Sequence, residues 1–247
     1  MIRDMARGFL RRLPGSWRRR IGWLRNGAPA PGNLDLGDLR RVTPLSREFG
    51  YDRGRPVDRY YIETFLAASS DLVRGRVLEI GDRDYTERFG GNRVTRSDVL
   101  NVNPGKPVTT IVADLADGQG IPSDAFDCVI LTQTLQLLYD LRPAIATLRR
   151  ILKPGGTLLL TVPGTISQVA TDEWGATWYW GFTALSLRRL LEEAFPAACI
   201  ELSQHGNVLA GIGFLQGMAA EEFSAAELEH RDELYPLVIT ARITRPS

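Results

Sequence analysis

Short apolar runs alternate with segments of helical periodicity through most of this 247-residue chain. Runs of this length are typical of buried strands, so the alternation predicts a doubly wound, mostly parallel α/β sheet with helices on both faces. A ligand of such a sheet binds beyond the carboxyl ends of the strands. The predicted strands are 76–81, 93–97, 108–113, 127–133, 157–162, 199–204 and 236–244, and the clearest helices are 57–73, 140–152 and 183–195.

The composition excludes a disordered or fibrous chain, because 44% of the residues are hydrophobic and 24% are charged. The two cysteines, Cys128 and Cys199, lie in apolar runs and are predicted to be buried, reduced thiols. His205 and His230 are too few for a His-rich metal cage, and the acidic residues are too scattered to indicate a magnesium site. The sequence therefore indicates no metal-binding residues, although carboxylates could still hold a hard cation and any metal requirement is left open.

Charge is concentrated at the N-terminus. Residues 1–25 contain eight arginines and one acid and carry +7, whereas the whole chain carries +1, so the remainder carries −6. Apolar side chains at roughly helical spacing among these arginines indicate a basic amphipathic helix on an anionic membrane or on a protein partner. A solvated arginine-rich tail explains the same residues equally well.

A Pro/Gly linker ends at residue 32 and predicts the domain organisation. We expect a tail and linker at 1–32 and one domain at 33–247, with a lid segment at 44–75 and a core at 76–247. The chain has no run of about 20 apolar residues and no secretory signal, so we expect a cytoplasmic protein.

Acidic residues follow three of the predicted strands. Gly81 ends the first strand, Asp98 follows the second strand 17 positions later, and Asp114 follows the third. In dinucleotide-type sites a glycine turn lets the ligand approach the backbone, and an acid about 20 residues on accepts hydrogen bonds from the ribose hydroxyls. Each acid alone is equally typical of a helix N-cap or a turn, but the set favours a ribonucleoside site.

The turn after the first strand does not favour a pyrophosphate. It lacks the second and third glycines of G-x-G-x-x-G, and Asp82 and Asp84 would repel phosphate groups. S-adenosylmethionine, which carries an adenosine, a sulfonium and an ammonium, fits this acidic turn better than NAD does.

With these features the chain resembles the class I S-adenosylmethionine-dependent methyltransferases, of the methyltransferase-type-11 kind that acts on small molecules. The resemblance implies a Rossmann-like, seven-stranded sheet and an S-adenosylmethionine cofactor. The glycine motif is degenerate, since only Gly81 of the family's G-x-G-x-G is present. The segments that carry the resemblance are 77–81, Asp98, 113–115, 126–136 and 148–160, the last containing Lys153-Pro-Gly-Gly156.

The same resemblance implies roles for individual residues. Glu79 and Gly81 would border the methionine part of the cofactor, Asp82 would take the ammonium and Tyr85 would pack beside it. Asp98 would bind the ribose. The remaining implied contacts are Asp114 and Leu115 for the adenine, and Thr132 and Gln133 for the floor between cofactor and acceptor.

Candidates for the acceptor side are less specific. His205 has the right chemistry for a general base, although a structural histidine explains it as well. The aromatic segment 172–182 contains Trp174, Trp178 and Tyr179, whose rings could stack on a sugar or a flat natural product, and Tyr60 or Arg59 could face the ligand from the lid. Packing onto the core is the alternative for each.

The sequence therefore predicts a methyltransferase of saccharide or natural-product biosynthesis that methylates an oxygen of a sugar or of a glycosylated or polyketide-like molecule. The alternative is an inactive binding or scaffold protein on the same fold. A nucleic-acid methyltransferase is disfavoured by the −6 charge outside the tail, and an NAD oxidoreductase by the acidic turn. The acceptor and the oligomeric state are left open.

Overall fold

The structure is a computed structural model that describes residues 14, 17, 27, 29, 32–169 and 177–247. It divides the chain into two compact units, Met1–Thr43 and Pro44–Ser247. The predicted boundary at residue 32 falls inside the first unit. Among the described residues of that unit is one 3-10 turn, η1 (Gly37–Arg40), whose side chains are all exposed.

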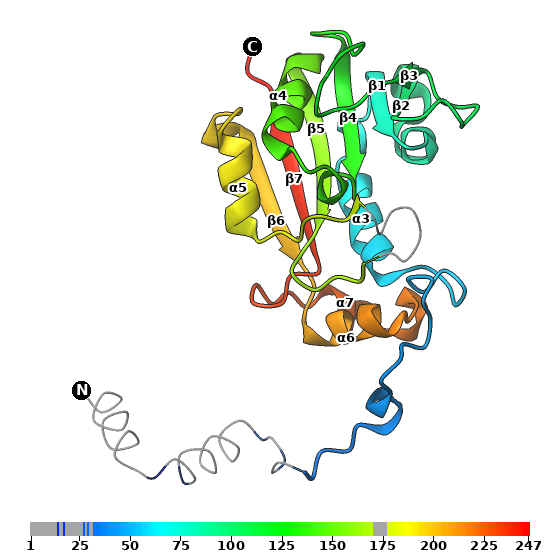
Figure 1. Cartoon of the computed structure of the whole chain (residues 1–247), viewed down its shortest axis with the longest axis vertical. Coiled ribbons are helices and arrows are strands. Elements are labelled where there is room, and N and C mark those ends of the chain that lie inside the picture. The colour runs from blue at the N-terminus through cyan, green and yellow to red at the C-terminus, as the bar shows by residue number, and fades with distance from the viewer. Residues whose placement is uncertain (1–13, 15–16, 18–26, 28, 30–31, 170–176) are drawn as a thin grey trace. The chain divides into compact units, whose positions relative to one another are not determined.

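The second unit is built around a seven-stranded sheet (Figure 1). The strand order is β3-β2-β1-β4-β5-β7-β6, and β7 pairs antiparallel with both of its neighbours while the other strands pair in parallel. This confirms the predicted doubly wound, Rossmann-like fold. The strands are β1 (Gly75–Ile80), β2 (Val94–Asn101), β3 (Ile111–Val112), β4 (Phe126–Thr132), β5 (Leu152–Pro163), β6 (Ile200–His205) and β7 (Val238–Thr244).

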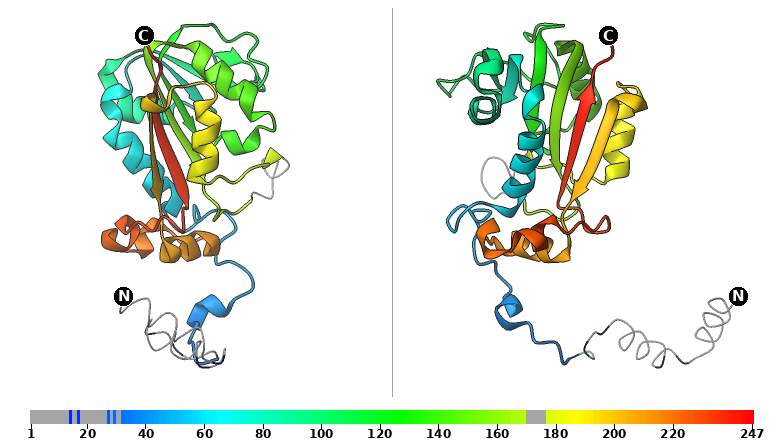
Figure 2. Two further views of the ribbon diagram at one scale, coloured as in Figure 1. Left: turned by 90° about the vertical axis from the view of Figure 1, so that its left-hand side faces the viewer. Right: turned by 180° about the vertical axis from the view of Figure 1, so that it is seen from behind.

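Helices cover both faces of the sheet (Figure 2). On one face α4 (Leu141–Ile151) and α5 (Ala184–Glu192) pack against Val129 and Leu131, and on the other α3 (Val57–Ala68) and α6 (Val208–Gln216) pack against Cys128 and Ile130. Because successive strand residues point to opposite faces, burial on both faces makes residues 128–131 of β4 a continuous apolar run. Cys128 is buried and Cys199 half-buried, and both are free thiols.

Side-chain caps set several helix boundaries. Thr183 and Ser186 form a capping box at the start of α5, Asn207 accepts a hydrogen bond from the Ala210 amide at the start of α6, and Ser224 caps α7 (Ala225–Glu229). The α6 helix is absent from the sequence prediction because it is apolar on every side and therefore has no amphipathic period. The shorter elements are η2 (Ser70–Leu72), η3 (Thr86–Gly90), η4 (Gly91–Arg93), η5 (Leu135–Leu137), η7 (Ala197–Cys199) and η8 (Ala220–Glu222).

Several predicted boundaries differ from those of the structure. The second strand continues past residue 97 to Asn101, and the predicted helix at 57–73 ends at Ala68. The strand predicted at 157–162 begins earlier, at Leu152, so Lys153–Gly156 lies inside β5, where the pairing with β4 shifts register and Gly155 adopts a φ of +76°. None of the helices in the described part of the chain combines the length and hydrophobicity needed to cross a membrane.

Candidate functional site

A cavity of about 1120 Å³ opens at the carboxyl ends of β1, β2 and β4. One wall comes from the strand ends and the loops that follow them, and the other comes from the segment 48–63 and from α6. Parallel strands present their loops at the same edge, so residues far apart in sequence meet here. The strand-end residues that line it are Glu79, Ile80, Gly81, Asp82, Asp84, Tyr85, Leu100, Asn101, Val102, Asp114, Leu115, Thr132, Gln133 and Thr134.

The turn after β1 is held by the Glu79 carboxylate. Glu79 is buried and accepts hydrogen bonds from the amide of Tyr85 at 3.2 Å and from the amide and hydroxyl of Thr86, both at 2.7 Å. Burial raises the pKa of Glu79 to about 7, although these hydrogen bonds favour the charged form. Gly81 adopts a φ of +91°, which favours glycine, and the side of its Cα where a Cβ would project is open. The turn thus leaves room for a ligand.

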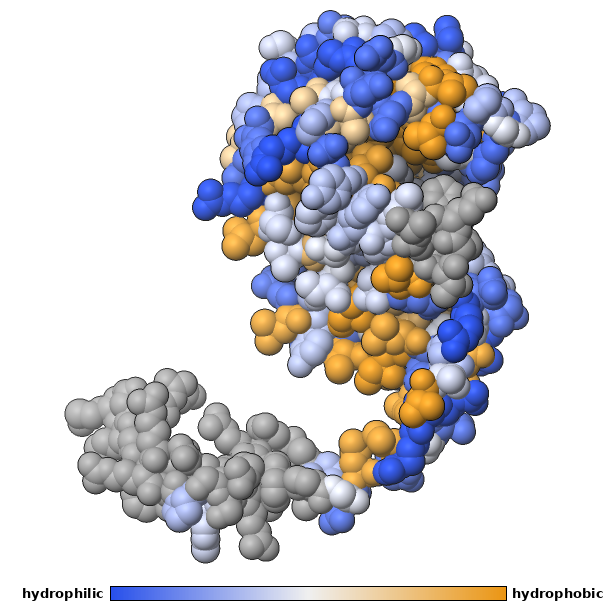
Figure 3. All heavy atoms as spheres, in the orientation of Figure 1, coloured by the Kyte–Doolittle hydropathy of each residue, from blue (hydrophilic) through white to orange (hydrophobic). Residues whose placement is uncertain are grey.

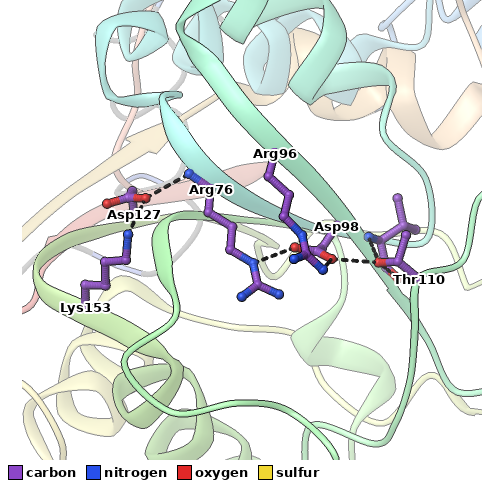
Figure 4. A network of polar contacts seen from close by, with 7 residues as sticks. Arg76, Arg96, Asp98, Thr110, Asp127 and Lys153 are labelled. Carbon is purple, nitrogen blue, oxygen red and sulfur yellow. Dashed lines mark hydrogen bonds and ion pairs between the residues drawn. The ribbon is translucent and has the colours of Figure 1, made fainter.

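Asp98 does not line the cavity. It lies within β2, with 1% of its surface exposed, and its carboxylate accepts hydrogen bonds from Arg76 at 2.7 Å and Arg96 at 3.1 Å (Figure 4). Burial alone would raise the pKa of Asp98, but the two arginines outweigh it and hold that pKa below its usual value. This corrects the expectation that Asp98 closes the second strand. The carboxylate that was to face a ribose is instead part of the protein's own ion-pair network.

Asn101 occupies the strand end that Asp98 was expected to fill. Its amide nitrogen donates to the Gly81 carbonyl at 3.3 Å and to the Thr109 hydroxyl at 2.9 Å. The Lys106 ammonium donates to the same Gly81 carbonyl at 3.0 Å and lies 3.8 Å from the Asp82 carboxylate. The turn therefore already attracts one cation. Sequence reasoning missed Asn101 and Lys106, and the apolar run Val99–Leu100 that precedes Asn101 was the available signal for the longer strand.

The other predicted cofactor residues lie along the same rim. The exposed Asp114 carboxylate accepts a hydrogen bond from the Ala116 amide at 2.7 Å, and Leu115 is buried beside it. Gln133 adopts a left-handed φ of +46° directly after β4 and lines the cavity. Within the described part of the chain, neither Nε2 of Gln133 nor Oε1 of Gln136 has a hydrogen-bond partner, although both atoms are buried. Such atoms favour a polar ligand.

The segment 48–63 contributes a polar cluster to the opposite wall. The Arg59 guanidinium donates to the Tyr85 hydroxyl at 2.7 Å and to the Tyr51 hydroxyl at 2.9 Å, and all three residues line the cavity. Asp58 lies beside them, and burial raises the pKa of its carboxyl despite the neighbouring Arg59. Tyr60 is not part of this wall, because its hydroxyl contacts Glu229 at 3.4 Å outside the cavity.

The predicted aromatic residues separate into three groups. Trp178 lines the cavity, and Trp174 lies outside the described residues. Tyr179 is 49% exposed and packs edge-to-face on Tyr139 with ring centroids 5.4 Å apart, so it does not face the cavity. The segment thus supplies one described aromatic ring to the site.

His205 lies at the end of β6 and is not among the residues that line the cavity. Its Nε2 lies 3.0 Å from the Thr240 hydroxyl, and burial, with Arg231 nearby, lowers the pKa of His205 to about 4. A histidine with this pKa is neutral at pH 7 and bound to the neighbouring strand. The structure therefore does not bring the sequence-predicted base to the site. Among the described residues, no group of three or more His, Cys, Asp and Glu side chains is placed to hold a metal ion.

Comparisons with known proteins find similarity to methyltransferases. Residues 90–160 match the family described as "Methyltransferase domain". The N-methyltransferase NodS from Bradyrhizobium japonicum, solved with S-adenosyl-L-homocysteine, is 19% identical, with a TM-score of 0.50 over 82% of this chain and 97% of that chain. A phosphoethanolamine N-methyltransferase 2 from Haemonchus contortus is 14% identical, with a TM-score of 0.50 over 89% of this chain and 62% of that chain. No curated protein sequence matches the chain.

Proposed function

We propose that the chain transfers a methyl group from S-adenosylmethionine to an oxygen of a sugar or of a glycosylated or polyketide-like small molecule. Two findings support this proposal. Residues 90–160 match a methyltransferase domain, and the fold is that of the class I S-adenosylmethionine-dependent methyltransferases. The observation that carries this proposal is the single cavity that joins the strand-end rim to the polar wall of segment 48–63. One wall suits a nucleoside cofactor and the other a hydroxyl-bearing acceptor.

The rim fits a cationic nucleoside. The open space at Gly81 admits the ligand, and the Gly81 carbonyl with Asp82 offers negative charge to an ammonium group, as the position of Lys106 indicates. We assign the ribose to the amide oxygen of Asn101, whose nitrogen already donates to Gly81 and Thr109, and the adenine to Asp114 and Leu115. Two solved proteins of this fold hold S-adenosylhomocysteine, which supports the assignment. When bound, S-adenosylmethionine supplies an electrophilic methyl group on a sulfonium.

The opposite wall fits a polar acceptor. From the strand-end side of the cavity, Nε2 of Gln133 and Oε1 of Gln136 can donate to and accept from hydroxyl groups of that acceptor, and Trp178 offers an aromatic face. Methyl transfer to an alcohol needs alignment of the oxygen and removal of its proton. Asp58 lies in the wall formed by segment 48–63, and burial raises the pKa of its carboxyl, which makes it a stronger base than an exposed carboxylate, so we assign it as the proton acceptor.

Calorimetric titration tests the cofactor before the acceptor is known. We expect the full chain to bind S-adenosylmethionine and S-adenosylhomocysteine at micromolar concentration and to bind NAD at least about 100-fold more weakly, since Asp82 and Asp84 oppose a pyrophosphate. Absence of binding by the folded protein would overturn the proposal.

A binding or scaffold protein on the same fold is the second candidate. The Lys106 ammonium lies at the Gly81 carbonyl and the Asp82 carboxylate, where the cofactor ammonium would be held. Replacement of Lys106 by Met distinguishes the two functions. If Lys106 blocks the site, the variant binds S-adenosylmethionine and the wild type does not, whereas a functional site binds it in both proteins.

A further inference from the structure

We propose that the outer face of α6 docks on an anionic membrane surface, with the arginine-rich N-terminal segment as a second contact to the same surface. The outer face consists of Val208, Leu209, Ile212 and Leu215, which are 52%, 40%, 36% and 49% exposed. These side chains recur at helical spacing and form one stripe, and Gln216 is the one polar residue of the helix.

The position of α6 makes this exposure unusual. Its inner face is buried, with Ala210 and Phe214 in the core cluster that includes α3, and Phe214 also lines the cavity. In Figure 3 apolar side chains gather over α6, at the end of the body away from the C-terminus. Isolated exposed aliphatic residues are ordinary, but a helix with an aliphatic outer face is typical of an interaction surface.

The chain that precedes the second unit joins it at this helix. The amides of Leu45 and Ser46 donate to the Gln216 carbonyl at 2.8 and 3.1 Å, so the N-terminal segment enters the unit beside the C-terminus of α6. Residues 1–47 contain eleven arginines and three acids. Basic residues attract anionic lipid, and an apolar face with an adjoining polybasic segment gives the two signals that peripheral attachment requires.

Charge favours a lipid surface over a second copy of the chain. A second copy docked through α6 would add a second arginine-rich segment to the complex, and like charges would oppose the contact. The outer face also lacks the aromatic side chains that are enriched at protein interfaces. A bilayer complements both features, because its acyl chains suit the aliphatic face and its anionic headgroups attract the arginine-rich segment, whereas the −6 charge of residues 26–247 opposes the headgroups. The cavity then lies directly behind the docked helix, because Phe214 belongs to both.

Vesicle sedimentation of the full chain tests this proposal without cofactor, so its outcome is independent of the proposed activity. The probes are vesicles of phosphatidylcholine alone and with about one-third phosphatidylglycerol. Replacement of Val208 and Leu215 by Gln should weaken binding to the anionic vesicles about tenfold, since both side chains lose their burial in the interface. The matched control replaces Val112 of β3 and Leu185 of α5 by Gln. These side chains are 53% and 68% exposed, and the control should change vesicle binding less than about twofold.

A third variant tests the basic contact. Replacement of Arg18, Arg19 and Arg20 by Gln should also reduce binding, and added salt should weaken the wild type more than this variant. Circular dichroism confirms that each variant is folded. The proposal would be overturned if the wild type did not sediment with anionic vesicles, or if the control variant lost as much vesicle binding as the α6 variant. It would also be overturned if the wild type were a dimer and the α6 variant a monomer. Tighter vesicle binding by the arginine variant would overturn it as well, because the N-terminal segment would then cover α6.

Discussion

The ion-pair network around Asp98 and the rim of the cavity use similar side chains in opposite ways. In the network the carboxylates of Asp98 and Asp127 each contact basic side chains, with Arg76 and Lys153 at 2.7 Å (Figure 4). At the rim the Asp114 carboxylate accepts a hydrogen bond from the neighbouring Ala116 amide, and buried amide atoms of Gln133 and Gln136 have no partner among the described residues. Polar groups with protein partners stabilise the fold, whereas those without partners are available to a ligand.

The largest effect is expected at the acceptor wall. Replacement of Asp58 by Asn should lower kcat about 1000-fold, because a general base contributes about 10²- to 10⁴-fold, while the affinity for S-adenosylmethionine stays within about twofold. The measurement is transfer of labelled methyl to the best acceptor in a panel of free and glycosylated sugars. Replacement of the exposed Asp71 by Asn is the control, and equal kcat in both variants would remove Asp58 from the mechanism.

Glu79 shares a property with each region, because it lines the cavity and its carboxylate also accepts hydrogen bonds from protein amides. Its pKa in the folded state, about 7, is above the ordinary value of 4.5, so its stabilising contribution is complete below pH 4.5 and is lost as the pH rises through 7. Relative to the Glu79→Gln variant, the wild type should lose about 3 kcal/mol of unfolding free energy between these limits. Urea unfolding at several pH values measures the difference, and parallel curves for the two proteins would contradict the raised pKa.

A substitution of Asp98 tests whether the ion-pair network stabilises the fold. Replacement by Ala should lower the unfolding free energy by about 2 kcal/mol, below the range for a fully buried pair because water reaches the arginines once the carboxylate is gone. The Arg76 and Arg96 side chains are 25% and 61% exposed. Cofactor affinity at a temperature where the variant is folded should be unchanged within about twofold. A tenfold loss of affinity would restore the ribose role that the sequence indicated.

A substitution of Asn101 tests whether the rim of the cavity binds the cofactor. Replacement by Ala should weaken S-adenosylmethionine binding about fivefold, close to the 1 kcal/mol typical of one hydrogen bond. It should also lower the unfolding free energy by about 1 kcal/mol, because the amide nitrogen donates to Gly81 and Thr109. Replacement of Asn92, which lies in the exposed turn η4, is the matched control. Calorimetric titration gives both affinities. Equal values for the two variants would contradict the assignment of the ribose to Asn101.

The smallest effect is expected at His205. Replacement by Gln preserves a hydrogen bond to Thr240 and should leave kcat within about twofold, since the ring lies outside the cavity wall. A kcat loss above about tenfold, with unchanged stability, would place His205 in the reaction after all.

The sequence predicted the fold well because strand and helix patterns are local. The seven strands, the order of strands and helices along the chain, and the glycine turn at residue 81 all follow from periodicity and from residues next to one another in the chain. The resemblance carried by segments such as 126–136 and 148–160 supplied the fold family, and residues 90–160 match its domain. The alternation also placed Glu79, Asp114 and Gln133 correctly beside strand ends, since a strand end is a local property.

Only the tertiary structure decided which of these groups face the cavity. Asp98 and Asn101 are three positions apart on one strand, and a strand boundary shifted by a few residues exchanges a buried ion pair for a ligand-facing amide. The partners Arg76, Arg59 and Lys106 are distant from Asp98, Tyr85 and Gly81 in sequence, so no local pattern contains these contacts. Periodicity encodes the burial of a segment, whereas the pairing of side chains depends on which segments the fold brings together.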